Sequence, residues 1–179
     1  MLPHYENTCI MKILVDADSC PKPARELVLR RAAKLNLRII FAANRQIPCS
    51  LANNSLVSNS LANNTDEEIT GAEMEICPEG ENSADDRIVE LACGGDIVIT
   101  RDVPLAKRLV EKDIYVLDDR GRIFTSNNIN ELLSIRNFTV GLAENGLGAE
   151  RTSNYGKKEL KSFADSLDRT LSKNLSHKR

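Results

Sequence analysis

The sequence contains no tryptophan, and aromatic residues make up only 4% of it. Proteins that hold single-stranded nucleic acid on stacking platforms need aromatic side chains, so this composition argues against such a platform. The formal net charge is −2, which argues against a protein that coats nucleic acid by bulk positive charge. Neither the low aromatic content nor the lack of net positive charge excludes an enzyme that binds a few phosphates with local Lys and Arg side chains.

Cysteine and histidine show no metal-binding or catalytic pattern. The five cysteines are an odd number and include no C-x-x-C pair, and the two histidines, His4 and His177, lie in the terminal segments. Neither a disulfide framework nor a structural zinc site follows from this pattern. Cys20 stands at a predicted helix start, but the missing histidine base argues against cysteine catalysis.

The chain has no apolar stretch of membrane-spanning length, and its amino terminus lacks the cationic and apolar regions of a signal peptide. These absences predict a cytoplasmic protein with no membrane partner. Its 179 residues predict one domain with a substantial core. We expect an extension over residues 1–10 and a single domain over 11–179, since Met11 opens the first predicted strand and could be the functional start.

Short apolar runs alternate with segments of helical periodicity. We predict strands over residues 11–15, 37–42, 72–76, 96–100 and 114–117, and helices over 22–35, 84–93, 103–112, 128–136 and 157–175. This alternation predicts the α/β class, a three-layer fold around a mainly parallel central sheet with a C-terminal helix. The Ser/Asn-rich stretch near 44–70 repeats a Ser-Leu-Ala-Asn-Asn unit and predicts a low-complexity loop, an insertion with local disorder.

Aspartates stand where such a fold binds its ligands. Asp16 and Asp18 follow the first strand, and Asp102 follows the strand at 96–100. Asp85 lies at the start of a predicted helix. Because the carboxyl ends of parallel strands share one edge of the sheet, we expect these carboxylates to converge. Carboxylates without a local positive charge are costly to cluster unless a hard cation joins them, so the pattern predicts a Mg²⁺ or Mn²⁺ site for phosphate chemistry.

Each aspartate also has a purely structural interpretation. Asp18 or Ser19 could cap the helix at 22–35, and Asp102 could cap the helix that follows it. Asp85 shares a helix face with Ile88 and so points inwards. Its only role could still be a favourable interaction with the positive end of the helix dipole. Asp86 falls on the solvent side. Three such coincidences at one edge favour the metal site over capping alone.

The expected roles are as follows. Asp16, Asp85 and Asp102 hold the metal, and Asp18 positions or activates water, so all four are candidate catalytic residues. Candidate contacts to the substrate phosphate are Arg45, Ser83, Arg101 and Lys107. The alternative for the three basic residues is that their side chains only face solvent.

The chain resembles the YaiI/YqxD family of uncharacterised bacterial proteins over about residues 11–140. The matching stretches are Val15-Asp16-Ala17-Asp18-Ser19-Cys20-Pro21, Ala84-Asp85 with Ile88 beyond, residues 95–106 (GDIVITRDVPLA), and Arg120-Gly121 before Ile123. That family is similar to PIN-like domains, whose active members are metal-dependent nucleases. The resemblance implies that Asp16, Asp85 and Asp102 form a PIN-type acidic site, although Pro104 and Leu105 stand where such nucleases often carry a further acid.

Three functions therefore remain open. The first is a Mg²⁺- or Mn²⁺-dependent nuclease or phosphodiesterase that acts on RNA or another nucleic acid. The second is a non-catalytic module that binds nucleic acid or a protein and keeps the acidic pocket for structural reasons. The third, less favoured, is an aspartyl phosphatase in which Asp16 is the nucleophile and Lys107 and Asp118-Asp119 complete the site. The sequence leaves the oligomeric state open.

Overall fold

The computed structural model describes residues 11–45, 47, 72–78, 80, 82–147 and 154–177. The expected extension at 1–10 lies outside the described residues, as does nearly all of the expected loop near 44–70. Within the described part of the chain, no helix is long and apolar enough to cross a membrane.

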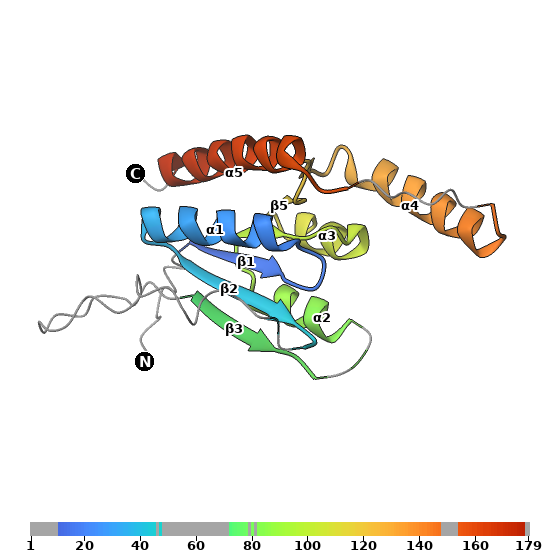
Figure 1. The fold of residues 1–179 in the computed structure, drawn as a ribbon, viewed down its shortest axis with the longest axis horizontal. Coiled ribbons are helices and arrows are strands. Elements are labelled where there is room, and N and C mark those ends of the chain that lie inside the picture. The colour runs from blue at the N-terminus through green and yellow to red at the C-terminus, as the bar shows by residue number, and fades with distance from the viewer. Residues whose placement is uncertain are drawn as a thin grey trace, which may run out of the picture.

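The described residues form a six-stranded sheet whose order is β3-β2-β1-β4-β5-β6 (Figure 1). Its strands are β1 (Lys12–Asp16), β2 (Arg38–Ala43), β3 (Ala72–Ile76), β4 (Ile97–Ile99), β5 (Tyr115–Leu117) and β6 (Ile123–Phe124). Strands β1 to β5 are parallel, and β6 pairs antiparallel with β5. The chain builds outwards from β1 on one side and then restarts with β4 on the other, so the order reverses between β1 and β4. Open α/β sheets bind ligands at the carboxyl ends of the strands at such a switch point.

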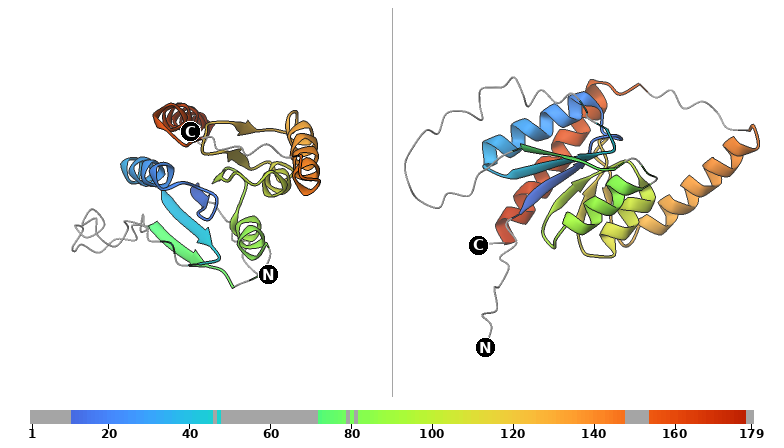
Figure 2. Two further views of the ribbon diagram at one scale, coloured as in Figure 1. Left: turned by 45° about the vertical axis from the view of Figure 1, so that its right-hand side comes forward. Right: turned by 90° about the horizontal axis from the view of Figure 1, so that it is seen from below.

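Helices cover both faces of this sheet, which confirms the predicted three-layer α/β class (Figure 2). The helices are α1 (Lys22–Leu35), α2 (Ser83–Leu91), α3 (Val103–Val110), α4 (Ile129–Glu144) and α5 (Lys157–His177). One core joins the sheet to α1 and α5, with Val28 and Phe163 fully buried in it. The other joins the sheet to α2, α3 and the start of α4, where Ile88 and Leu109 are fully buried.

Strands β1 and β4 are held in register from both ends. Leu14 lies opposite Val98 in the middle of the pairing. At the amino end the buried Asp96 carboxylate accepts hydrogen bonds from the Lys12 backbone N–H at 3.0 Å and from Lys12 Nζ at 2.6 Å. At the carboxyl end Thr100 Oγ1 donates to Asp16 Oδ2 at 2.7 Å. A buried charge needs such pairing, so this arrangement fixes which carboxyl-end residues of the two strands face each other.

Two elements differ from the prediction. The short antiparallel strand β6 was missed, because a two-residue strand has too little period-two pattern to be recognised. Helix α4 was predicted to end at residue 136 but continues to Glu144. The residues beyond 136 include Asn137, Thr139 and Gly141, which are poor helix formers. Their sequence therefore predicted an earlier end than the structure has.

Gly121 is required where the β5–β6 turn packs on α5. It has φ of +88°, and a Cβ there would lie 2.5 Å from the backbone oxygen of Ser162. The Gly121 carbonyl in turn accepts a hydrogen bond from Ser166 Oγ at 2.8 Å. We expect Gly121→Ala to destabilise the protein by about 2–4 kcal/mol, because backbone strain adds to a clash that no rotamer relieves.

Urea unfolding followed by circular dichroism measures this loss. Gly94→Ala is the matched control, since a Cβ at Gly94 meets nothing within 4 Å and its φ is not positive. Equal unfolding midpoints for the two variants would contradict the tight approach between the turn and α5.

Candidate functional site

A cavity of about 330 Å³ opens at the carboxyl edge of the sheet, where β1 and β4 meet. Four carboxylates from three separate segments contribute to its wall. Its lining residues are Asp16, Asp18, Ser19, Asn44, Asn82, Ala84, Asp85 and Asp102. The structure therefore brings together all four of the aspartates that the sequence proposed as catalytic.

Asp16 is the most buried of the four, with 5% of its surface exposed. Its Oδ2 accepts the Thr100 hydroxyl, and its Oδ1 accepts the Ser19 backbone N–H at 3.3 Å. The Thr100 hydroxyl also accepts the backbone N–H of Asp102 at 3.0 Å. Thr100 thus links the loop after β1 to the loop after β4, and it holds Asp16 and Asp102 on the same side of the cavity.

Asp102 has the capping role that its position suggested. Its Oδ1 accepts the Leu105 backbone N–H at 2.7 Å at the start of α3. That bond uses one lone pair of a group that has about four acceptor positions, so Asp102 can both cap the helix and face the cavity. By contrast, neither Asp18 nor Ser19 caps α1, whose N-cap position is Pro21 with no side-chain cap.

Asp85 is the least compensated carboxylate of the group. It is partly buried in the first turn of α2, and it forms no hydrogen bond or ion pair with the described residues. Burial raises the pKa of Asp85 to about 6, and repulsion from Asp102 and then Asp16 adds to this shift. The nearby Arg108 only partly opposes it, because its guanidinium pairs with Asp86 at 2.7 Å. Asp86 is exposed, as its helix position predicted.

Asp18 differs from the other three because it has a basic partner. Its Oδ1 lies 3.3 Å from Arg45 Nε, and its Oδ2 accepts the Asn44 backbone N–H at 2.8 Å. The Arg45 side chain is 77% exposed, so this ion pair stands at the rim of the cavity in contact with water. An exposed pair of this kind is weak and can exchange partners.

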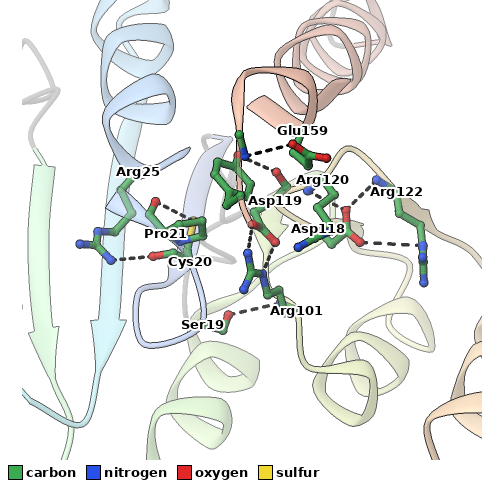
Figure 3. Close-up of polar contacts among 12 residues, drawn as sticks. Ser19, Cys20, Pro21, Arg25, Arg101, Asp118, Asp119, Arg120, Arg122 and Glu159 are labelled. Atoms are coloured by element: carbon green, nitrogen blue, oxygen red, sulfur yellow. Dashed lines mark hydrogen bonds and ion pairs between the residues drawn. The ribbon is translucent and has the colours of Figure 1, made fainter. Parts of the chain in front are cut away.

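None of the four predicted phosphate contacts lines the cavity, and the other three have partners of their own. Arg101 forms a two-pronged ion pair with Asp119 (Figure 3). Its guanidinium also lies over the Tyr155 ring, 5.9 Å from the ring centroid. Lys107 lies 3.9 Å from Glu111 on α3. The Ser83 hydroxyl donates to the Pro78 carbonyl at 2.5 Å and lies 2.9 Å from Asn44 Oδ1. Of the four, Arg45 alone is bonded directly to a carboxylate of the cavity.

Two arginines hydrogen-bond to the loop after β1 from different sides (Figure 3). Arg25 Nη1 donates to the carbonyl oxygens of Ala17 and Cys20 at 3.1 and 2.6 Å. The Arg101 backbone N–H donates to Ser19 Oγ at 3.2 Å. Burial raises the pKa of the enclosed Cys20 thiol to about 12, so the thiolate needed for nucleophilic attack does not form near neutral pH.

The donor chemistry of the cavity suits a hard divalent cation, since carboxylate and amide oxygens are the groups that Mg²⁺ and Mn²⁺ prefer. The metal ligands are not preassembled, however. Among the described residues no three His, Cys, Asp or Glu side chains are placed so that they could hold a metal ion as they stand. A cation would have to draw the side chains of Asp16, Asp85 and Asp102 closer together. Asp85 could move most easily, because no hydrogen bond to the described residues holds its carboxylate.

Sequence reasoning missed several groups at this site. Ser19, Asn44 and Asn82 line the cavity, and the Thr100 hydroxyl joins the Asp16 carboxylate to the backbone N–H of Asp102. Asn44 had a usable signal, because it follows β2 at the same edge of the sheet. Asn82 had a weaker one, since Asn before a helix is commonly a cap, and here its side chain forms no cap bond.

The sequence of the chain matches one family of known proteins. Residues 54–173 match the family model described as "Uncharacterized BCR, YaiI/YqxD family". The chain is 45% identical to a UPF0178 protein of Treponema denticola over 92% of this chain and 94% of that one. It is 41% identical to a UPF0178 protein of Treponema pallidum over 91% of this chain and 82% of that one, and 37% identical to one of Myxococcus xanthus over 91% and 95%. No solved structure matches the chain.

The raised pKa of Asp85 predicts how stability depends on pH. A carboxyl with a pKa near 6 in the folded protein binds a proton more tightly there than in the unfolded chain. It therefore contributes stability below about pH 4, and this contribution is lost as the pH rises through about 6. In the presence of a chelator, we expect Asp85→Asn to raise the free energy of unfolding at pH 7 by about 1–2 kcal/mol, after allowance for solvent screening.

Urea unfolding of wild type and variant at pH 4 and pH 7 measures this effect. The neighbouring Asp86→Asn is the control, because that exposed carboxylate already pairs with Arg108 and its removal brings no gain. A loss of stability in Asp85→Asn at pH 7 would show that the Asp85 charge is compensated after all.

Proposed function

The chain belongs to the YaiI/YqxD family, and we propose that it is a Mg²⁺- or Mn²⁺-dependent hydrolase of phosphodiester bonds, a nuclease that acts on RNA. One observation carries the proposal. Asp16, Asp85 and Asp102 come from three separate segments, line one cavity, and form no ion pair with the described residues. Uncompensated carboxylates at a ligand-binding edge are the arrangement that a hard cation stabilises.

The residues have distinct tasks in this proposal. Asp16, Asp85 and Asp102 hold the metal, and they are the residues to which the resemblance to PIN-like nucleases assigns an acidic site. The metal, when bound, lowers the pKa of a water molecule and offsets negative charge on the phosphate. Asp18 orients that water from the rim of the cavity. Its partner Arg45 can leave it for a phosphate oxygen, because the existing ion pair is exposed to solvent.

The phosphate contacts are better assigned to Arg45 and Arg108 than to Arg101. The Arg108 side chain is 43% exposed and lies close enough to Asp85 to lower its pKa. Arg101 is engaged with Asp119, whose side chain is 1% exposed, so its release would leave a buried carboxylate unpaired. We assign Arg101 to positioning, since its backbone also holds Ser19.

The non-catalytic alternative is favoured by a specific observation. Asp16 and Asp102 each take part in structural hydrogen bonds, and the described residues form no preassembled set of three metal ligands. A module that binds a partner through this acidic cavity would show the same geometry. The aspartyl phosphatase has less support, because Lys107, Asp118 and Asp119 do not line the cavity.

Metal binding and cleavage together test the proposal. We expect Mn²⁺ to raise the melting temperature of the wild-type protein, because the cation relieves repulsion between the carboxylates. Asp16→Asn and Asp102→Asn should weaken this rise and lower hydrolysis of a mixed RNA and DNA panel by about 100-fold or more. Asp113→Asn is the control, since that exposed carboxylate lies outside the cavity, and it should keep both. Binding of metal without cleavage of any substrate would favour the non-catalytic module, and cleavage that survives both substitutions would exclude the proposed site.

Asp18 should separate metal binding from turnover. Because it lies at the rim and is not assigned to the metal, we expect Asp18→Asn to keep the thermal shift with Mn²⁺ while turnover falls by about 10–100-fold. Arg45→Ala is the companion variant, since it removes the ion-pair partner of Asp18 and should raise KM for the nucleic acid. Equal loss of metal binding in Asp18→Asn and Asp16→Asn would instead make Asp18 a metal ligand.

A further inference from the structure

Three lysines gather at the start of α5, at the same edge of the sheet as the acidic cavity. They are Lys157, Lys158 and Lys161, and all three are exposed. The segment before α5 is tied to the turn after β5, since the Tyr155 hydroxyl donates to the Asp119 carbonyl at 2.8 Å. Figure 1 shows that α5 begins at the edge toward which the strand arrows point. We call these three residues the α5 lysine cluster.

The charges of the cluster are not compensated within the described part of the chain. None of the three lysines forms an ion pair with a described residue. At the same edge, by contrast, Arg101 and Arg122 each pair with an aspartate. Lys157 and Lys161 are four positions apart, and Lys158 and Lys161 are three apart, so like charges are neighbours on the helix surface. Such pairs are unfavourable, and an anionic partner would offset their repulsion.

The position of the cluster on its helix is unfavourable as well. Lys157 and Lys158 lie in the first turn of α5, where the helix dipole favours acidic residues and disfavours cations. The acid of that turn is engaged with the backbone, since Glu159 Oε2 accepts the Gly156 N–H at 3.0 Å. Backbone N–H groups lower the pKa of Glu159, and the charge of Arg120 in the neighbouring turn lowers it further (Figure 3). The cluster therefore adds positive charge where the fold gains nothing from it.

The surroundings of the cluster favour a nucleic acid over a membrane as the anionic partner. A helix that binds an anionic membrane exposes large apolar side chains beside its cations. Over residues 154–165 no large apolar side chain is exposed, and the outward positions beside the cluster are Ser162 and Asp165. Phosphates of a nucleic acid are bound by cations that reach into solvent, and they need no aromatic platform.

The cluster lies within reach of a strand whose phosphate occupies the cavity. The cavity opens where β1 and β4 meet, and β5 is the next strand beyond β4. Neighbouring strands are about 4.8 Å apart, so the end of β5 lies roughly 10 Å along the edge from the end of β1. A few nucleotides span this distance. Asp118 and Asp119 follow β5, and each is paired with an arginine, so they repel a phosphate less.

We propose that the α5 lysine cluster binds the phosphates of an RNA strand that extends from the acidic cavity along the carboxyl edge of the sheet. This inference rests on the proposed function, which places the scissile phosphodiester in the cavity. The cluster adds affinity for the strand and does not touch the reacting atoms. It therefore gives long substrates an advantage over small phosphodiesters, whatever their base sequence.

Binding of RNA without metal tests the cluster separately from catalysis. The probe is a labelled single-stranded RNA of about 20 nucleotides in the presence of a chelator, and fluorescence anisotropy measures its Kd over a range of salt concentrations. The variant carries Lys157→Gln, Lys158→Gln and Lys161→Gln together. We expect its Kd to rise about tenfold or more, and the slope of log Kd against log salt to fall by about 2, because each phosphate contact of a single strand contributes roughly 0.7.

The matched control removes the same charge elsewhere, through Arg30→Gln, Lys34→Gln and Lys112→Gln. These exposed residues lie on segments that lead to the amino edge of the sheet, so the Kd should stay within about twofold of wild type. Circular dichroism checks that both variants are folded. With Mn²⁺, both should hydrolyse the small diester bis(p-nitrophenyl) phosphate like wild type, whereas only the cluster variant should show a raised KM for RNA.

Equal RNA affinity in wild type and the cluster variant would overturn this inference, even if both cleave the small diester. If wild type cleaves no diester but the cluster variant still loses RNA binding, the nuclease is excluded and the cluster stands as an RNA-binding surface. An acidic peptide of similar charge that displaces the RNA from wild type at equal concentration would overturn RNA as the partner.

Discussion

The side-by-side pairing of β1 with β4 is the constraint on which the rest of this structure depends. The buried Lys12–Asp96 pair fixes its amino end, and the Thr100–Asp16 hydrogen bond fixes its carboxyl end. Parallel strands in register present their carboxyl ends at one edge, so Asp16 and Thr100 must lie next to each other. Because Thr100 also receives the Asp102 N–H, the two acidic loops form one unit. The chain order reverses at this same pairing, which leaves the cavity open between the helices on either side.

Many carboxylates in the described part of the chain have a basic partner, and Asp85 stands in contrast to them. Asp96 and Asp119 are almost fully buried and each has a basic partner, as a buried charge requires. Asp86 and Asp18 pair with arginines at the surface. Asp85 has no such partner among the described residues, and its pKa is raised mainly by burial and then by neighbouring acids. The uncompensated charge of Asp85 lowers the stability of the folded protein. Binding of a cation or of a basic ligand would offset this loss.

The acidic cavity concentrates charge of one sign in a small volume, and such a volume suits a compact ion of opposite sign. The outer part of α4 lies apart from it, and no residue of that helix lines the cavity. This part of the helix presents Ile135 and Phe138 to solvent, with exposed fractions of 48% and 69%.

The sequence alone determined the α/β class, nearly all of the strands and helices, and the four aspartates of the cavity. It could do so because apolar periodicity and the position of a residue after a strand are local properties. Tertiary structure alone decided how each charge is used. Arg101 looked like a phosphate ligand from its place beside Asp102, but Asp119, eighteen residues further on, holds its side chain. Likewise, Thr100 became the bridge between two loops, and α4 continued beyond Arg136. Such outcomes depend on partners that are distant in the chain, and a local pattern does not specify them.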